Sequence, residues 1–157
     1  MPEQSHFTGC NKMDEAITIN CTTGETSVEN IPPVPLPEAK AQKWQETKVG
    51  RSAKETGGCQ TPFGRVQTDA ASIAKINGLT TLALIAKGAG APFSVEFTME
   101  DNSLTVLDAD MAIGLGVTVG QFVAAVYACA NDKRALIESA DSQAGLDSID
   151  LQAGWPS

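Results

Sequence analysis

The sequence contains few of the side chains on which catalytic and metal sites depend. Its 157 residues include one histidine, His6, and four scattered cysteines, with no C-x-x-C pair and no zinc-finger spacing. A Ser-His-Asp or Cys-His site would have to use His6, which lies near the N-terminus and outside the predicted core. We therefore expect no catalytic residue, no metal site, no bound cofactor and no enzymatic activity.

Basic residues are also scarce. The chain has 11 Lys and Arg residues against 19 Asp and Glu residues, a formal net charge of −8. Because nucleic-acid binding needs clustered basic side chains, we expect no nucleic-acid partner. The negative charge lies in residues 88–157, with ten acids and two bases, whereas residues 40–65 hold six of the 11 bases. These two parts either attract each other, within one chain or between copies, or are ordinary solvated surfaces.

Aromatic residues make up only 5% of the chain, so a core must rest on alanine, valine, isoleucine and leucine. The sequence does not begin with the basic and then apolar segment of a signal peptide. We expect synthesis in a reducing cytosol, with free thiols. The length suits one domain, residues 38–157, preceded by an arm, residues 1–37.

The arm is predicted to contain one small β-hairpin and an extended strap. Residues 16–21 alternate in polarity, a turn with Gly24 follows, and residues 26–28 return as the second strand, while residues 1–15 are irregular. Prolines dominate residues 31–37, which predicts an extended, semi-rigid strap, with Pro37 suited to the first turn of the helix that follows. The apolar side chains of this arm are candidate partner contacts: Ile17, Ile19, Val34 and Leu36.

The domain is predicted to be α+β, and it opens with a mostly polar helix over residues 38–55. This helix has only a narrow apolar stripe, with Trp44 as the candidate anchor to a partner, or else it is a solvent-exposed connector. Gly57 and Gly58 end it. A loop over residues 59–65, a short strand over 65–67 and a helix capped by Thr68 follow. That helix runs to residue 87 with a broad apolar face: Ile73, Ile76, Leu79, Thr80, Leu82, Ala83 and Leu84.

A β-hairpin, a long helix and a short helix complete the predicted domain. Residues 93–99 and 104–107 alternate in polarity around a turn at 100–103, which predicts a hairpin with one buried face. The long helix begins with Asp108 and Asp110 and reaches residue 139, with Lys133 and Arg134 at its C-terminal dipole. The short helix covers residues 142–149. Asp101, Asp108 and Asp110 could form a carboxylate pair, but a turn and helix-start charges explain their positions.

The long helix allows two interpretations. Residues 111–130 carry no charge and contain Gly116-x-x-x-Gly120, as a membrane-spanning helix of a holin-like protein would. We favour a core helix and no membrane partner, because the neighbouring amphipathic helix and hairpin need an apolar surface to pack on. Gly114, Gly116 and Gly120 weaken the helix, so they either bend it or allow another backbone to approach.

A string of motifs in fixed order covers residues 40–157. The motifs are Trp44-x-x-x-Lys48-x-x-Arg51, Gly57-Gly58-Cys59-x-Thr61-Pro62-Phe63-Gly64-Arg65-Val66-x-Thr68-Asp69, Ser72-Ile73-x-Lys75-Ile76-Asn77-Gly78, Pro92-Phe93-Ser94-Val95, Leu107-Asp108-Ala109 and Ile149-Asp150-Leu151-x-Ala153-Gly154-Trp155-Pro156. This string resembles an uncharacterised domain of tailed-bacteriophage tail proteins. The resemblance implies no activity and supplies no catalytic residues.

The resemblance and the scarcity of catalytic groups together predict a structural component of a phage tail. We expect it at the distal tail or baseplate, or joining tail fibres, with other tail proteins as partners and several copies in the assembly. It would be made in the host bacterial cytoplasm and end in the virion. The alternative within the same family is a tail-fibre assembly chaperone that is absent from the finished particle.

Overall fold

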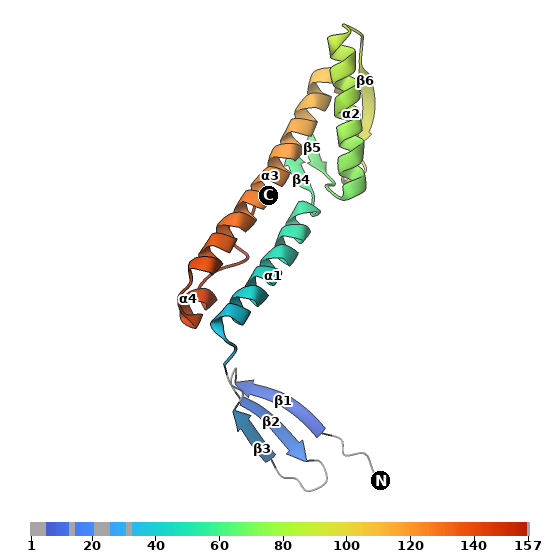
Figure 1. The fold of residues 1–157 in the computed structure, drawn as a ribbon. Helices are drawn as coiled ribbons and strands as arrows, with labels where there is room; N and C mark the ends of the chain where they lie inside the picture. The colour runs from blue at the N-terminus through green and yellow to red at the C-terminus, as the bar shows by residue number, and fades with distance from the viewer. Residues whose placement is uncertain (1–5, 13–14, 21–25, 31–32, 157) are drawn as a thin grey trace. The chain divides into compact units, whose positions relative to one another are not determined.

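The computed structural model describes residues 6–12, 15–20, 26–30 and 33–156, and it has the expected α+β fold (Figure 1). The chain divides into two units, Met1–Ala39 and Lys40–Ser157. The elements are β1 (His6–Lys12), β2 (Glu15–Asn20), β3 (Thr26–Asn30), α1 (Leu36–Glu55), β4 (Cys59–Thr61), β5 (Gly64–Val66), α2 (Ala70–Gly88), β6 (Ser94–Thr98), β7 (Leu104–Asp108), α3 (Ala109–Ser139) and α4 (Gln143–Asp147).

The first unit contains a three-stranded antiparallel sheet in the order β1-β2-β3. The predicted hairpin corresponds to β2 and β3, with Ile17 opposite Val28, whereas its turn with Gly24 lies outside the described residues. The prediction that residues 1–15 are irregular is wrong for β1, which pairs along β2 with Phe7 opposite Ile19. A two-stranded hairpin is marginal in water, and pairing with β1 supplies the additional main-chain hydrogen bonds.

In the second unit, the segment between α1 and α2 is a hairpin and not the predicted loop. β4 and β5 pair antiparallel, with Cys59 opposite Val66. Both of these side chains are buried, and burial on the helices stabilises strands that local propensity does not favour. The Thr61 hydroxyl closes the hairpin by donating to the Gly64 carbonyl at 2.6 Å. The predicted strand over 65–67 is thus shifted by one residue and has a partner.

Asp69, not Thr68, caps α2. The Asp69 carboxylate accepts from the amides of Ala71 (2.9 Å) and Ser72 (3.1 Å), as an N-cap does. Thr68 is 1% exposed and serves a different purpose: its hydroxyl donates to the Glu55 carbonyl at 2.5 Å and accepts from the Gly58 amide at 2.9 Å. Thr68 therefore ties the end of α1 to the start of α2.

Thr68→Val is expected to lower the free energy of unfolding by about 2 kcal/mol, because it leaves a buried amide and a carbonyl without partners. Urea unfolding followed by helical circular dichroism measures this effect. Thr81→Val is the matched control, since the Thr81 hydroxyl is exposed and bonds only within α2, to Asn77. Equal stability of the two variants would contradict the role given to Thr68.

The predicted hairpin and the two helices after it are confirmed. β6 and β7 pair antiparallel around a turn in which Asn102 has a positive φ of 64°. Asp108 caps α3 by accepting from the Met111 amide at 2.9 Å, and Ser142 caps α4. Lys133 and Arg134 lie before the last turn of α3, which contains no basic residue, so the predicted dipole interaction is wrong.

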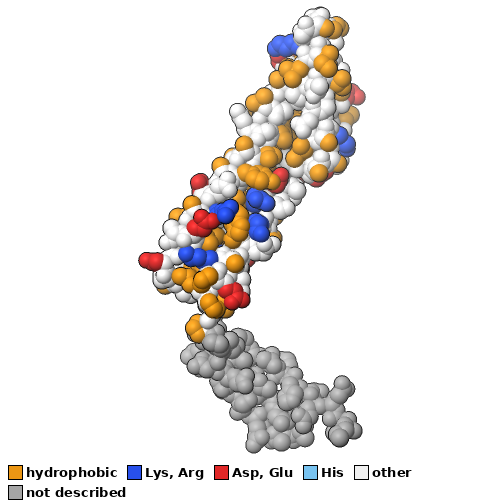
Figure 2. Space-filling model, viewed as in Figure 1, with side chains coloured by type: hydrophobic (Ala, Val, Ile, Leu, Met, Phe, Trp, Pro, Cys, Tyr) orange, Lys and Arg blue, Asp and Glu red, His pale blue; other side chains and the backbone are white. Residues whose placement is uncertain are grey.

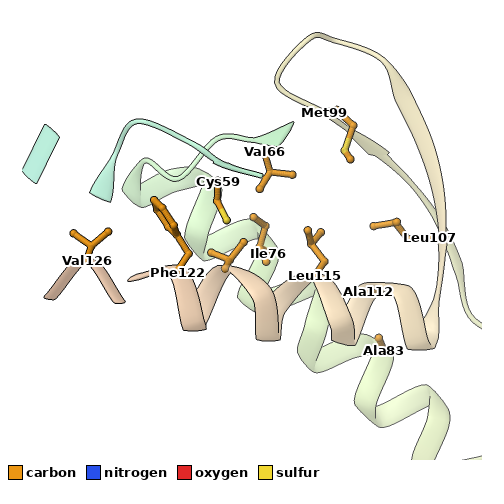
Figure 3. Packing of buried hydrophobic residues seen from close by; sticks show 11 residues of the cluster. Cys59, Val66, Ile76, Ala83, Met99, Leu107, Ala112, Leu115, Phe122 and Val126 are labelled. Carbon is orange, nitrogen blue, oxygen red and sulfur yellow. The ribbon is translucent and has the colours of Figure 1, made fainter. Parts of the chain in front are cut away.

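The core of the second unit gathers on one face of α3. Leu115, Phe122 and Val126 of α3 face β4, β5 and α2, and Leu107 of β7 joins them (Figure 3). α3 has 31 residues and is therefore about 46 Å long, enough for two helices to pack along it one after the other. α2 lies beside its first half and α1 beside its second half (Figure 1). The side chains of α3 that the sequence placed in this core are buried or half-buried: Met111, Leu115, Val119, Phe122, Val126 and Cys129.

One glycine of α3 permits close packing of the two helices. A Cβ atom added to Gly116 would lie 2.2 Å from the Thr80 Oγ1 atom of α2. The same addition at Gly114 or Gly120 would meet nothing within 4 Å. Since α3 is continuous through all three positions, close approach is the function of Gly116 alone.

Candidate interaction surface

The five candidate contact residues lie in both units. Ile17 and Ile19 are two residues apart and share a face of β2, where the structure describes the main chain. Val34 is 46% exposed before α1, and Leu36 is half-buried as the first residue of α1. Trp44 lies on α1 within Lys40–Ser157, so it belongs to a different unit from the other four.

Trp44 has a partner within its own domain. Its side chain is half-buried, and the Arg134 guanidinium of α3 stands 5.3 Å from the ring centroid. The Arg134 Nε atom also pairs with Glu138 at 2.7 Å. The polar helix α1 therefore leans on α3 and is not a free connector, and any partner of Trp44 outside the chain would have to share this ring.

Other contacts also hold α1 against α3 and the C-terminal segment. The Arg51 guanidinium lies 4.7 Å from the Tyr127 ring centroid, an arrangement that a cation and an aromatic face favour. The Lys40 Nζ atom donates to the Glu138 carbonyl at 2.8 Å. The Trp155 ring lies close to Gly50, where an added Cβ atom would be in ordinary van der Waals contact with it at 3.6 Å. Blue and red side chains accordingly gather over α1 and the second half of α3 (Figure 2).

Part of the predicted attraction between the basic middle and the acidic C-terminal part occurs within the chain. Arg65 pairs with Glu100 at 2.6 Å. Lys40 and Lys43 reach the same region, but they donate to the main-chain carbonyls of Glu138 and Asp147 and not to carboxylates. The attraction is therefore more hydrogen bonding than ion pairing.

The three carboxylates considered for acid–base chemistry have structural partners, as expected. Asp101 accepts from the Ser103 amide and hydroxyl in the hairpin turn, and these bonds lower its pKa. Asp108 is the cap of α3, and Asp110 pairs with Lys87. Across residues 33–156, no three His, Cys, Asp or Glu side chains are grouped as metal ligands.

The two cysteines whose side chains the structure describes are free thiols. Burial raises the pKa of the Cys59 thiol, and the Arg65 guanidinium counteracts this only in part. Cys59 is therefore protonated at neutral pH and packs as a small apolar side chain in the core.

Helix α2 exposes apolar side chains that a partner could cover. Of its 19 residues, only Ile76 and Ala83 are buried, while Leu82 and Ile85 are 61% and 63% exposed. The predicted broad apolar face is wrong for Leu82 and Leu84, which face solvent. In the sequence, apolar residues of α2 occur on more than one face of the helix. This distribution was the available signal that some of them would stay exposed.

A groove of about 410 Å³ lies between α2 and β6. Leu79, Phe97 and Met99 give it an apolar lining, and Lys75 and Glu96 add one charge of each sign. The full lining is Gln67, Ser72, Lys75, Leu79, residues 96–99 and Asn102. Sequence reasoning missed this groove, because its two sides, the first half of α2 and residues 96–99, come together only when the chain folds.

Helix α3 is also long and apolar enough to cross a membrane, by length and composition. Within its most apolar stretch, 28% of the residues are buried. Val117 is 53% exposed in that stretch. The apolar surface of this helix is therefore larger than its own domain covers.

Comparison with known proteins adds a family. The family described as Domain of unknown function (DUF4376) matches residues 38–152, nearly the whole of the second unit. No curated protein and no solved structure matches the chain.

Proposed function

The chain belongs to the DUF4376 family, and we propose that it is a structural, non-enzymatic subunit of a bacteriophage tail. Its place is the distal tail or baseplate, or the junction with tail fibres, and its partners are other tail proteins and further copies of itself. The motifs that resemble phage tail proteins support the phage setting. All of them except the end of the last motif, residues 153–156, lie in the segment that the family covers.

The observation that carries this proposal is the exposed apolar surface of α2. Leu82, Leu84 and Ile85 of α2 are each more than half exposed, and burial of a leucine or isoleucine by a partner yields about 1.5–3 kcal/mol each. Interfaces gain most of their energy from a few such side chains. A subunit of this kind acts through the surface that it offers to its partners, whereas an enzyme acts through reactive side chains.

Mass spectrometry of purified virions tests the proposal. We expect the protein in finished particles at a fixed ratio to known tail proteins. Abundance in infected cells with absence from finished particles would support the assembly chaperone and contradict the structural role.

Ile85→Asn is expected to weaken incorporation into virions by about tenfold, because the variant loses an apolar contact with the partner. Val49→Asn is the matched control: Val49 is also 63% exposed, but on α1. Trp44→Ala tests the sequence-derived anchor in the same assay, with circular dichroism to check that the variant keeps its helices. Incorporation equal for Ile85→Asn and Val49→Asn would remove α2 from the interface.

A small membrane protein is the second candidate, and the apolar character of α3 favours it. This alternative expects the chain to sediment with membranes and to require detergent. The structural subunit is expected to remain in solution after membranes are removed. Flotation of a lysate on a density gradient distinguishes the two.

A further inference from the structure

The free edge of β6 is open along the groove. β6 belongs to a two-stranded sheet, so only one of its edges is paired, with β7. Residues in an antiparallel strand direct their amide and carbonyl groups to the two edges alternately. The Met99 amide bonds the Ser103 carbonyl at 2.9 Å, which places the odd-numbered residues of β6 toward β7. Ser94, Glu96 and Thr98 therefore direct their main-chain groups to the free edge.

The chain itself uses the end of this edge. The Glu100 amide, next in the even-numbered series, bonds the carbonyl of Arg65 in β5 at 3.0 Å. Further along the edge, the outward amide and carbonyl groups of Glu96 and Thr98 form no hydrogen bond with any group of residues 33–156. This edge is thus paired at Glu100 and open along Thr98 and Glu96.

The groove runs along that stretch. Four consecutive residues, 96–99, line it, although successive side chains of a strand point to opposite faces. Such a set can line one hollow only if the hollow lies along the edge of the strand. Leu79 and Lys75 of α2 form the opposite side. The volume of about 410 Å³ lies in the range of pockets that enclose ligands.

We propose that the groove between β6 and α2 binds an extended peptide of a neighbouring protein, which adds to the β6–β7 hairpin as a third, antiparallel strand. Outward amides and carbonyls that alternate along an edge are complementary to another main chain. The peptide residue opposite Glu96 lies on the same face and is basic. Its neighbours point inward and are apolar, over Phe97 and Leu79. The inference goes beyond the proposed tail function and holds for any partner that presents such a strand.

A synthetic octapeptide of alternating valine and lysine, acetylated, amidated and fluorescently labelled, is the probe. With lysine opposite Glu96, the lysine amides face β6 and the valine amides face away. N-methylation of the lysine amides is expected to weaken binding at least about tenfold relative to N-methylation of the valine amides. The two methylated peptides have the same charge and composition, so fluorescence anisotropy isolates the main-chain contribution.

Variants of the protein test the same edge. Glu96→Pro removes an outward amide and leaves the bonds between β6 and β7, because these use residues 95 and 97. It is expected to abolish binding of the unmodified peptide. Val106→Pro is the matched control on the far edge of β7, where Val106 is 58% exposed, and it is expected to bind normally.

Amide hydrogen exchange of the unaltered protein gives a second measurement that does not depend on the variants folding. Exchange of the Glu96 and Thr98 amides is expected to slow at least tenfold when the peptide is added. Absence of binding, equal affinity of the two methylated peptides, or unchanged exchange at both residues would overturn the proposal.

Discussion

Gly116→Ala is expected to lower the free energy of unfolding by about 2 kcal/mol, although alanine favours helices over glycine by about 1 kcal/mol. The added Cβ atom would stand 2.2, 3.0 and 3.1 Å from the Oγ1, Cγ2 and Cβ atoms of Thr80. Rotation of Thr80 cannot relieve all three contacts, so α2 and α3 must move apart. The Thr80 hydroxyl bonds both the Ile76 carbonyl (2.8 Å) and the Ala112 carbonyl (3.3 Å), and this link between the helices would be strained.

Urea unfolding, followed by circular dichroism of the helices, measures the change. Gly120→Ala is the matched control in the same helix: its Cβ atom would meet nothing within 4 Å, and the variant is expected to gain up to about 1 kcal/mol. Thr80→Ala combined with Gly116→Ala removes two of the three crowded atoms. This pair is expected to recover at least about 1 kcal/mol in a double-mutant cycle. Equal stabilities for the two glycine variants would mean that the helices do not approach at Gly116.

Lys133→Met is expected to destabilise the second unit by about 2–3 kcal/mol. Lys133 is only 7% exposed, and its ammonium donates to the carbonyls of Asp150 (3.1 Å) and Ala153 (2.6 Å). The same ammonium lies 5.3 Å from the centroid of the Trp155 ring. Methionine keeps the aliphatic stem but leaves two carbonyls and an aromatic face without a cation, so the C-terminal segment is expected to leave α3.

Tryptophan fluorescence measures this release, in a Trp44→Phe background so that Trp155 is the only emitter. A shift of the emission to longer wavelength, at a urea concentration that leaves the helices folded, is the expected signal. Lys87→Met serves as the control, because Lys87 forms an exposed pair with Asp110 that contributes well under 1 kcal/mol. If both variants behave alike, the C-terminal segment is held by apolar contacts and not by Lys133.

The cap of α2 gives a pH dependence whose sign follows from its hydrogen bonds. The Ser72 hydroxyl and amide lower the pKa of Asp69, so the carboxylate is charged at neutral pH. A lowered pKa contributes stability above the ordinary pKa of aspartate, and this stability is lost as the pH falls through the lowered value. The loss therefore belongs to acid conditions below about pH 4.

Local patterns were sufficient to place most elements of the second unit. Alternation predicted β6 and β7, and a three-to-four residue repeat predicted α3 from its start near Asp108 to its end at Ser139. The same patterns failed for β1, β4 and Thr68. Each of these depends on a partner that lies elsewhere in the chain: β2 for β1, buried helix surfaces for β4, and Glu55 for the Thr68 hydroxyl.

The candidate contact residues show a similar division. The sequence singled out Trp44 because an aromatic residue in a polar helix needs a surface to rest on, and the structure places Arg134 of α3 over it. Whether a partner also contacts Trp44, Ile17, Ile19, Val34 or Leu36 is still a prediction. The exposed side of α2 and the groove beside β6 are the additional surfaces that three-dimensional packing revealed.

The order of the four helices and the β6–β7 hairpin could be predicted from the chain, because caps, prolines, glycines and repeats act over a few neighbouring residues. Packing alone decided which face of α2 is buried, why Gly116 has no side chain and why Lys133 is enclosed. The contacts of Gly116 and Lys133 join residues 17 to 36 positions apart in the sequence, which meet only after folding. A pattern of neighbouring residues cannot predict such contacts.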